Sequence, residues 1–112
     1  MPGSRADATL MIEIAKWGAM IGVPEAARAI FAEDFDPDRV ESDDPSVRTV
    51  LLFNETIGTL VKNDLFNRDL VYDWLWVAGS WERVGPAAKR SREKAGVPQL
   101  WANFEALADG QR

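Results

Sequence analysis

The chain contains no cysteine and no histidine, and each absence removes whole classes of chemistry. Without cysteine it has no disulfide, no zinc–thiolate or iron–sulfur site and no thiol nucleophile. Without histidine, Ser–His–Asp triads, His-ligated zinc or haem and Glu-x-x-His di-iron motifs are excluded. Any catalysis would have to use carboxylate, Lys, Tyr, Ser or Thr groups. The lack of cysteine fits a reducing compartment, and we expect a cytoplasmic protein.

The length and charge of the chain predict one soluble domain. Its 112 residues, 46% of them apolar, suffice for a single domain over 1–112 that folds without a metal or a disulfide. The formal charge of −5 disfavours nucleic acid as a partner, because phosphate contacts dominate that affinity. Membrane association is not expected either. The apolar stretch 8–23 is interrupted by Glu13 and Lys16, is shorter than the ~20 residues of a membrane span, and does not resemble a secretory signal.

Capping residues and prolines predict an all-α bundle of four to five helices. Asp7 is expected to cap a first helix that ends near Ile21, with Gly22 closing it. Pro24 is typical of a first helical position and predicts a short second helix to about Ala32. Asp44-Pro45 repeats the pattern of cap and proline, and predicts a third helix that ends near Lys62.

The second half is expected to hold one long helix and one short helix. Asn67 is a candidate cap for a long helix through Val84, and Pro86 should kink or break it before it continues to Gly96. Pro98 should open a last helix that Gly110 closes.

The segment 47–53 allows a second interpretation. Its sequence "VRTVLLF" is rich in β-branched and aromatic residues, so propensity alone permits a strand. Helical periodicity favours a helix instead, because one face collects the apolar positions and the opposite face collects Arg48, Glu55, Thr59 and Lys62.

Asn54 lies in the middle of that apolar face, where an unpaired amide would cost ~1–3 kcal/mol. We expect it to be a buried amide that hydrogen-bonds a neighbouring helix, and the alternative is an amide that faces a ligand. Gly58, one turn later, would let another helix approach closely. Asn54 and Glu55 are therefore assigned structural polar roles.

The first helix is apolar around roughly 220° of its circumference, about twice what one buried face needs. Either it is central to the fold, or it buries a second face against another chain. We expect a homodimer in which the helix pairs with its own copy, so that Met11, Ala15 and Ala19 face their counterparts.

Tyr72, Trp76 and Arg83 share the more polar side of the predicted long helix, opposite a core stripe that includes Trp74 and Trp81. Trp, Tyr and Arg are enriched at binding hot spots, so these three are candidate protein-interface residues. The alternative is that Trp76 packs against the C-terminal segment of its own chain.

The segment 32–44 contains seven acidic residues and one base. Within it, Asp34, Asp36 and Asp38 alternate as in a calcium loop. The other calcium-loop positions do not fit, because the sixth residue is Arg39 rather than Gly and the twelfth is Pro45 rather than Glu. We therefore expect the acidic loop 33–44 to be solvated and to bind no specific metal.

A basic cluster follows in the second half, formed by Arg83, Lys89, Arg90, Arg92 and Lys94. We expect it to be a solvated face. Its Lys and Arg residues near the end of the helix interact favourably with the negative end of the helix dipole, and the cluster could also pair with the acidic loop.

No carboxylate constellation supports catalysis. All-α nucleotide pyrophosphatases hold magnesium with repeated Glu-x-x-Glu or Glu-x-x-Asp pairs. Here Asp69 and Asp73 are spaced i, i+4, and Asp69 belongs to a helix start. We therefore predict no catalytic residue and no cofactor.

The second half, from about Val50 to Ala108, contains the stretches "LLFNETIGTLVKNDLFNRDLVYDWL", "WERV" and "KRSREKAGVPQLWANFEALA". In these stretches it resembles a family of bacterial and archaeal helical proteins catalogued as domain of unknown function 4760. The resemblance implies an α-helical domain and no biochemical function. Many relatives carry N-terminal membrane helices, whereas this chain has only the interrupted stretch 8–23. The matching positions are Asn54, Glu55, Trp81, Arg90, Phe104, Glu105 and Leu107.

The sequence therefore predicts a protein-interaction or regulatory module that self-associates and could also bind another protein. The alternative is an enzyme that uses carboxylates on a small ligand or metal. The two differ in what the fold should show, because an enzyme needs a concave pocket with convergent carboxylates and an interaction module needs an exposed apolar patch.

Overall fold

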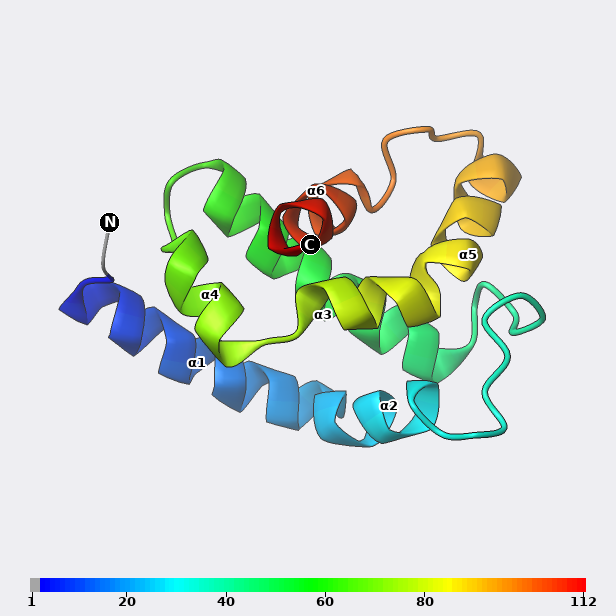
Figure 1. The fold of residues 1–112 in the computed structure, drawn as a ribbon, viewed down its shortest axis with the longest axis horizontal. Coiled ribbons are helices and arrows are strands. Elements are labelled where there is room, and N and C mark those ends of the chain that lie inside the picture. Colours follow the sequence, from blue (N-terminus) through cyan, green and yellow to red (C-terminus); the bar gives the residue numbers. More distant parts are fainter. Residues whose placement is uncertain (1–2) are drawn as a thin grey trace.

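The computed structural model describes residues 3–112, which form six helices and, within that range, no strand (Figure 1). The all-α prediction is confirmed, with one helix more than the largest number expected. The helices are α1 (Arg5–Ile21), α2 (Val23–Ile30), α3 (Pro45–Lys62), α4 (Arg68–Trp74), α5 (Val77–Ala95) and α6 (Ala102–Gln111).

The start of α1 differs by one turn from the prediction. Ser4, not Asp7, is the N-cap, and the Asp7 carboxylate accepts hydrogen bonds from the backbone N–H and the hydroxyl of Ser4. This reciprocal arrangement is a capping box, in which the acid stands three residues after the cap. The end of α1 is as predicted, because Gly22 takes the left-handed conformation with φ 87°.

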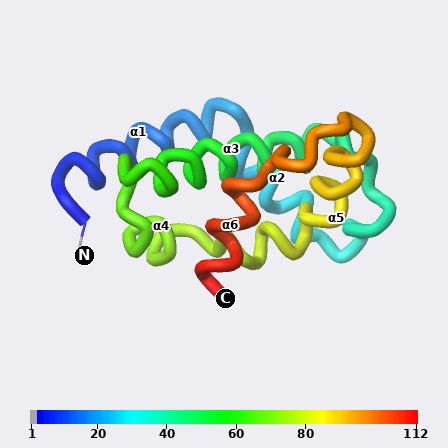
Figure 2. Tube along the Cα trace, turned by 90° about the horizontal axis from the view of Figure 1, so that it is seen from above, coloured from blue at the N-terminus to red at the C-terminus, as the bar shows by residue number. Residues whose placement is uncertain are grey.

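Helix α3 lies at the centre of the bundle. It includes the segment 47–53, which is therefore helical and not a strand. Asp44 caps it through the N–H of Val47, and Pro45 is its first residue, as the sequence predicts. Figures 1 and 2 show α3 running through the middle of the molecule with α1 and α2 along one side and α6 crossing it. Its predicted apolar face is buried: Val47, Val50, Leu51, Asn54, Ile57, Gly58 and Val61.

The long helix predicted from Asn67 through Val84 is wrong, because the chain leaves the helical conformation at Leu75 and Trp76. Leu75 is extended, with φ −125° and ψ 140°, and α5 begins only at Val77. The Gln111 side chain bonds the backbone on both sides of this break. Its amide N–H donates to the Leu75 carbonyl at 2.8 Å, and its amide oxygen accepts from the Ala78 N–H at 2.7 Å. A residue distant in sequence therefore bonds backbone groups that the break leaves without helical partners.

Pro86 does not divide α5, which continues as helix from Val77 to Ala95. Figure 1 shows that α5 changes direction near its middle, where Pro86 lies. The proline therefore bends the helix, as predicted, without ending it.

Helix α6 begins later than predicted. Residues 98–101 form turns, Trp101 adopts a left-handed conformation with φ 65°, and the helix starts at Ala102 rather than at Pro98. Gly110 lies within α6 and does not close it. Among residues 3–112, no helix has both the length and the apolar character needed to cross a bilayer.

Candidate interaction surfaces

Asn54 is buried, with 6% of its surface exposed, and it is hydrogen-bonded, as predicted. Its partner was not the expected one. The side-chain N–H donates to the Val50 carbonyl, 3.0 Å away and one turn earlier in the same helix, rather than to a neighbouring helix or into a pocket. Asn54 therefore has a local partner and a structural role.

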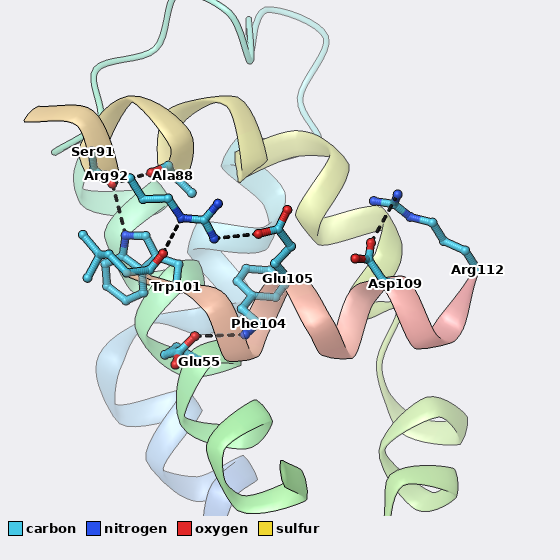
Figure 3. A network of polar contacts seen from close by, with 10 residues as sticks. Glu55, Ala88, Ser91, Arg92, Trp101, Phe104, Glu105, Asp109 and Arg112 are labelled. Carbon is cyan, nitrogen blue, oxygen red and sulfur yellow. Dashed lines mark hydrogen bonds and ion pairs between the residues drawn. The ribbon is translucent and has the colours of Figure 1, made fainter. Parts of the chain in front are cut away.

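Glu55 joins α3 to the start of α6. Its carboxylate accepts the backbone N–H of Phe104 at 2.9 Å (Figure 3). The N-terminal N–H groups of a helix have no partner within the helix, and the N-cap Trp101 supplies no side-chain acceptor. A carboxylate from another helix thus takes the place of a local cap.

Gly58 allows α3 and α6 to approach closely, as its sequence position suggested. A Cβ atom at Gly58 would lie 2.5 Å from the carbonyl oxygen of Asn103, which is backbone and cannot rotate away. The crossing of α3 and α6 therefore depends on a residue without a side chain at this point.

Arg92 anchors the other side of α6. Its guanidinium donates to the Glu105 carboxylate at 2.7 Å (Figure 3). It also donates to the Leu100 carbonyl at 2.5 Å and lies 5.7 Å from the ring centroid of Trp81. Trp81 in turn meets Phe104 edge to face at 5.0 Å. Several positions that carried the family resemblance thus hold α6 in place.

Helix α1 lies along one edge of the molecule in both views, so it is not central to the fold (Figures 1 and 2). Its inner face packs on α3, where Gly18 lies against the Phe53 ring and Trp17 meets the same ring at 5.7 Å. Its outer face is open to solvent, and Ile12 and Met20 are 53% and 83% exposed.

The three α1 residues predicted at a dimer seam do not share one environment. Ala15 and Ala19 are exposed on the outer face, next to Ile12. Met11 is half-buried and packs against the core of its own chain. The helical positions Ala8, Ile12, Ala15 and Ala19 follow the spacing i, i+4, i+7, i+11 and form one exposed stripe, which we call the outer stripe.

Tyr72 points into the molecule instead of toward solvent. Its hydroxyl donates to the Leu107 carbonyl of α6 at 2.7 Å, and partial burial raises the pKa of the phenol above its ordinary value. The residue therefore fastens α4 to α6, and its side chain is not on a surface with Trp76.

Arg83 and Arg90 bind the acidic loop through its backbone, not through its carboxylates. Arg83 donates to the carbonyls of Ile30, Ala32 and Phe35, the first at 2.6 Å. Arg90 donates to the carbonyls of Pro37 and Val40, the second at 2.6 Å. The acidic loop is thus held against α5 while its carboxylates remain outside, and only Lys89 and Lys94 of the basic cluster are exposed.

Trp76 does not pack against the C-terminal segment in the way the alternative interpretation required. It is 66% exposed, and its ring lies nearly parallel to the Phe31 ring, with centroids 5.8 Å apart. Phe31 ends α2 and is itself 44% exposed. The two rings form an exposed aromatic pair.

The carboxylates of the acidic loop do not converge. Asp36 accepts the backbone N–H of Asp38 at 3.0 Å and lies 3.7 Å from the Arg39 guanidinium. Over residues 3–112 the structure brings together no group of three acidic side chains that could hold a metal ion.

An open hollow of about 770 Å³ lies between the start of α1 and the turn from α3 to α4. Asp7 lines it, but the Asp7 carboxylate already accepts hydrogen bonds from Ser4 and from the backbone N–H of Asn67. These bonds lower the pKa of Asp7 below its ordinary value, the Ser4 backbone contributing most. The carboxylate joins α1 to α4 and is poorly suited to act as a base.

Sequence reasoning missed Phe31, Gln111 and the exposure of Ile12 and Met20. Ile12 was counted in the wide apolar arc, and its spacing from Ala15 and Ala19 could have placed it on their face. No local signal indicates that Phe31 meets Trp76 or that Gln111 meets Leu75, because each pair is far apart in the chain.

Comparison with known proteins adds a family and no activity. Searches of curated proteins and of solved structures find no match for the chain. A family model matches residues 4–111, a longer span than the resemblance at Val50 to Ala108 indicated. The match covers nearly the whole chain, and the chain belongs to the family described as Domain of unknown function (DUF4760).

Proposed function

We propose that the protein is a non-enzymatic interaction module that forms a homodimer through the outer stripe of α1. The observation that carries this proposal is the open aliphatic face of a peripheral helix, with Ile12 53% exposed beside Ala15 and Ala19. Burial of apolar surface contributes about 25 cal/mol per Å², so covering this face with a second copy would favour association.

The outer stripe suits a helix that packs against its own copy. Small side chains at Ala8, Ala15 and Ala19 let two backbones approach, and Ile12 supplies an apolar contact between them. A two-fold axis through the stripe would place each residue near its own counterpart or a neighbour. Met11, which packs against its own core, would lie at the edge of this seam and not at its centre.

The expected dimer is weak. Helix α1 has 17 residues and is therefore roughly 25 Å long, so one helix pair buries an area near the lower end of specific interfaces. The charge of −5 on each chain also opposes association over distance. We expect a dissociation constant on the order of micromolar, and tighter association at higher salt, which screens the repulsion.

Sedimentation velocity of the wild type against Ala15→Glu tests the proposal. The substitution sets like charges together in an apolar seam, so the mutant should be monomeric at concentrations where the wild type is dimeric. The matched control is Ala106→Glu, the same change at an exposed position of α6. A wild type that is monomeric at millimolar concentration, or an Ala15→Glu variant as dimeric as the wild type, would contradict the proposal.

A further inference from the structure

The exposed aromatic pair presents two large apolar rings to solvent. Trp76 keeps 66% of its surface exposed and Phe31 keeps 44%. Their rings are inclined by only 11°, so they form one continuous aromatic surface. Trp is the residue most typical of binding hot spots, because it supplies a large contact area with few rotatable bonds.

The structure holds both rings in place before any partner arrives. The Trp76 ring lies on the backbone of Gly79, where a Cβ atom would come within 2.3 Å of a ring carbon. Gln111 fixes the non-helical turn that carries Trp76. Arg83 fixes the carbonyls of Ile30 and Ala32, on either side of Phe31. A rigid surface loses little conformational entropy on binding.

The charges next to the pair in the chain are negative and unpaired. Glu33 and Asp34 follow Phe31, and Asp73 precedes Trp76. All three are exposed, and within residues 3–112 none of them has an ion-pair partner or a side-chain hydrogen bond. Of the nearby bases, Arg28 is exposed beside Glu25, 3.9 Å away, so the two charges balance, and Arg83 donates to loop carbonyls.

We propose that the aromatic pair is a second interaction surface, separate from the outer stripe, that binds a basic segment of a partner protein. An apolar side chain of that segment would cover the rings, and its Lys or Arg residues would meet Glu33, Asp34 and Asp73 or lie over a ring face. The same carboxylates repel nucleic acid and anionic membranes. A second copy of this chain, with its charge of −5, is also a poor match.

The test uses three short probe peptides of equal length that are titrated into the full chain. One alternates Lys with Leu, one alternates Glu with Leu, and one alternates Lys with Ser. The readout is the NMR signal of each tryptophan indole N–H, with Trp76 identified from the Trp76→Phe variant. The Lys–Leu peptide should shift the Trp76 signal, with an affinity that falls as salt rises, and the other two should bind at least about tenfold more weakly.

Variants locate the surface. Trp76→Ala should weaken Lys–Leu binding about tenfold or more, whereas Leu65→Ala, at a residue 64% exposed in the turn before α4, should leave it unchanged. Replacing Glu33 and Asp34 with Gln and Asn should also weaken binding, and the same change at Glu93 and Asp109 should not. Because Trp76 and Phe31 are exposed, Trp76→Ala and Phe31→Ala should each keep the wild-type circular dichroism spectrum. If Trp76→Ala does not fold, Phe31→Ala tests the same surface.

Three results would overturn the proposal. They are equal binding of the Glu–Leu peptide, unchanged binding by Trp76→Ala and Phe31→Ala, and self-association that depends on Trp76 in the absence of peptide. The first two results do not bear on the dimer proposed for α1, and Ala15→Glu tests that dimer separately.

Discussion

The carboxylate of Glu55, in the middle of α3, accepts the backbone N–H of Phe104 at the start of α6, 2.9 Å away. We expect Glu55→Ala to lower the free energy of unfolding by ~1–2 kcal/mol, because it removes a charged acceptor from a helix N-terminus. Urea unfolding measures this, with Glu93→Ala on the exposed side of α5 as the control. Equal stability of the two variants would show that the bond does not contribute.

Gln111 bonds both sides of the break between α4 and α5, so its removal should have a larger effect than its position in α6 suggests. Gln111→Ala leaves the Leu75 carbonyl and the Ala78 N–H without this partner, and should cost ~1–3 kcal/mol. Gln99→Ala, at an exposed position, is the control. Hydrogen exchange should show faster exchange of the Ala78 N–H in the Gln111 variant, and unchanged protection would contradict the role assigned to Gln111.

Among residues 3–112, the Asn54 side chain hydrogen-bonds the Val50 carbonyl alone. That carbonyl lies within α3, where it is also an acceptor of the regular helical hydrogen bond. Replacement of Asn54 therefore strands no distant partner. We expect Asn54→Leu to be as stable as the wild type or more stable by ~1 kcal/mol, because an apolar side chain with the same branching replaces a buried amide. Thermal and urea unfolding check this, and a loss above ~2 kcal/mol would indicate a partner beyond the helix.

Asp7 should make stability depend on acidic pH. Hydrogen bonds from Ser4 and Asn67 lower the pKa of Asp7 in the folded state. When the pKa of a carboxyl group is lower in the folded state, the group stabilises the fold at pH values above its unfolded pKa, which is near 3.9. This stability is lost as the pH falls through the pKa of the folded state. Asp7→Asn should therefore show a flatter decline of melting temperature with falling pH than the wild type.

Ser4→Ala provides the intermediate case for Asp7. It removes the hydroxyl donor at 2.8 Å and keeps the backbone donors of Ser4 and Asn67. The decline in melting temperature should then lie between those of the wild type and Asp7→Asn. Identical profiles for all three proteins would mean that these bonds do not stabilise the charged form of Asp7.

Features that arise from near neighbours in the chain can be predicted from the amino-acid sequence alone. Gly22 ends α1 because glycine adopts a positive φ at little cost, and Asp44-Pro45 starts α3 because cap and proline act within one turn. The buried face of α3 also followed from periodicity alone, since side chains three and four residues apart share a helix face.

Features that depend on distant partners could not be predicted in this way, because they follow from how the helices pack. Local propensity favoured a continuous helix across Leu75, and the bonds from Gln111 accompany a break there. Local propensity also favoured a last helix that begins at Pro98. In the structure this helix, α6, begins at Ala102, and Glu55 accepts the backbone N–H of Phe104 in its first turn. The wide apolar arc of α1 was equally compatible with a central and a peripheral helix. Packing on Phe53 placed it at the edge, because hydrophobicity specifies that a face be buried but not which surface covers it.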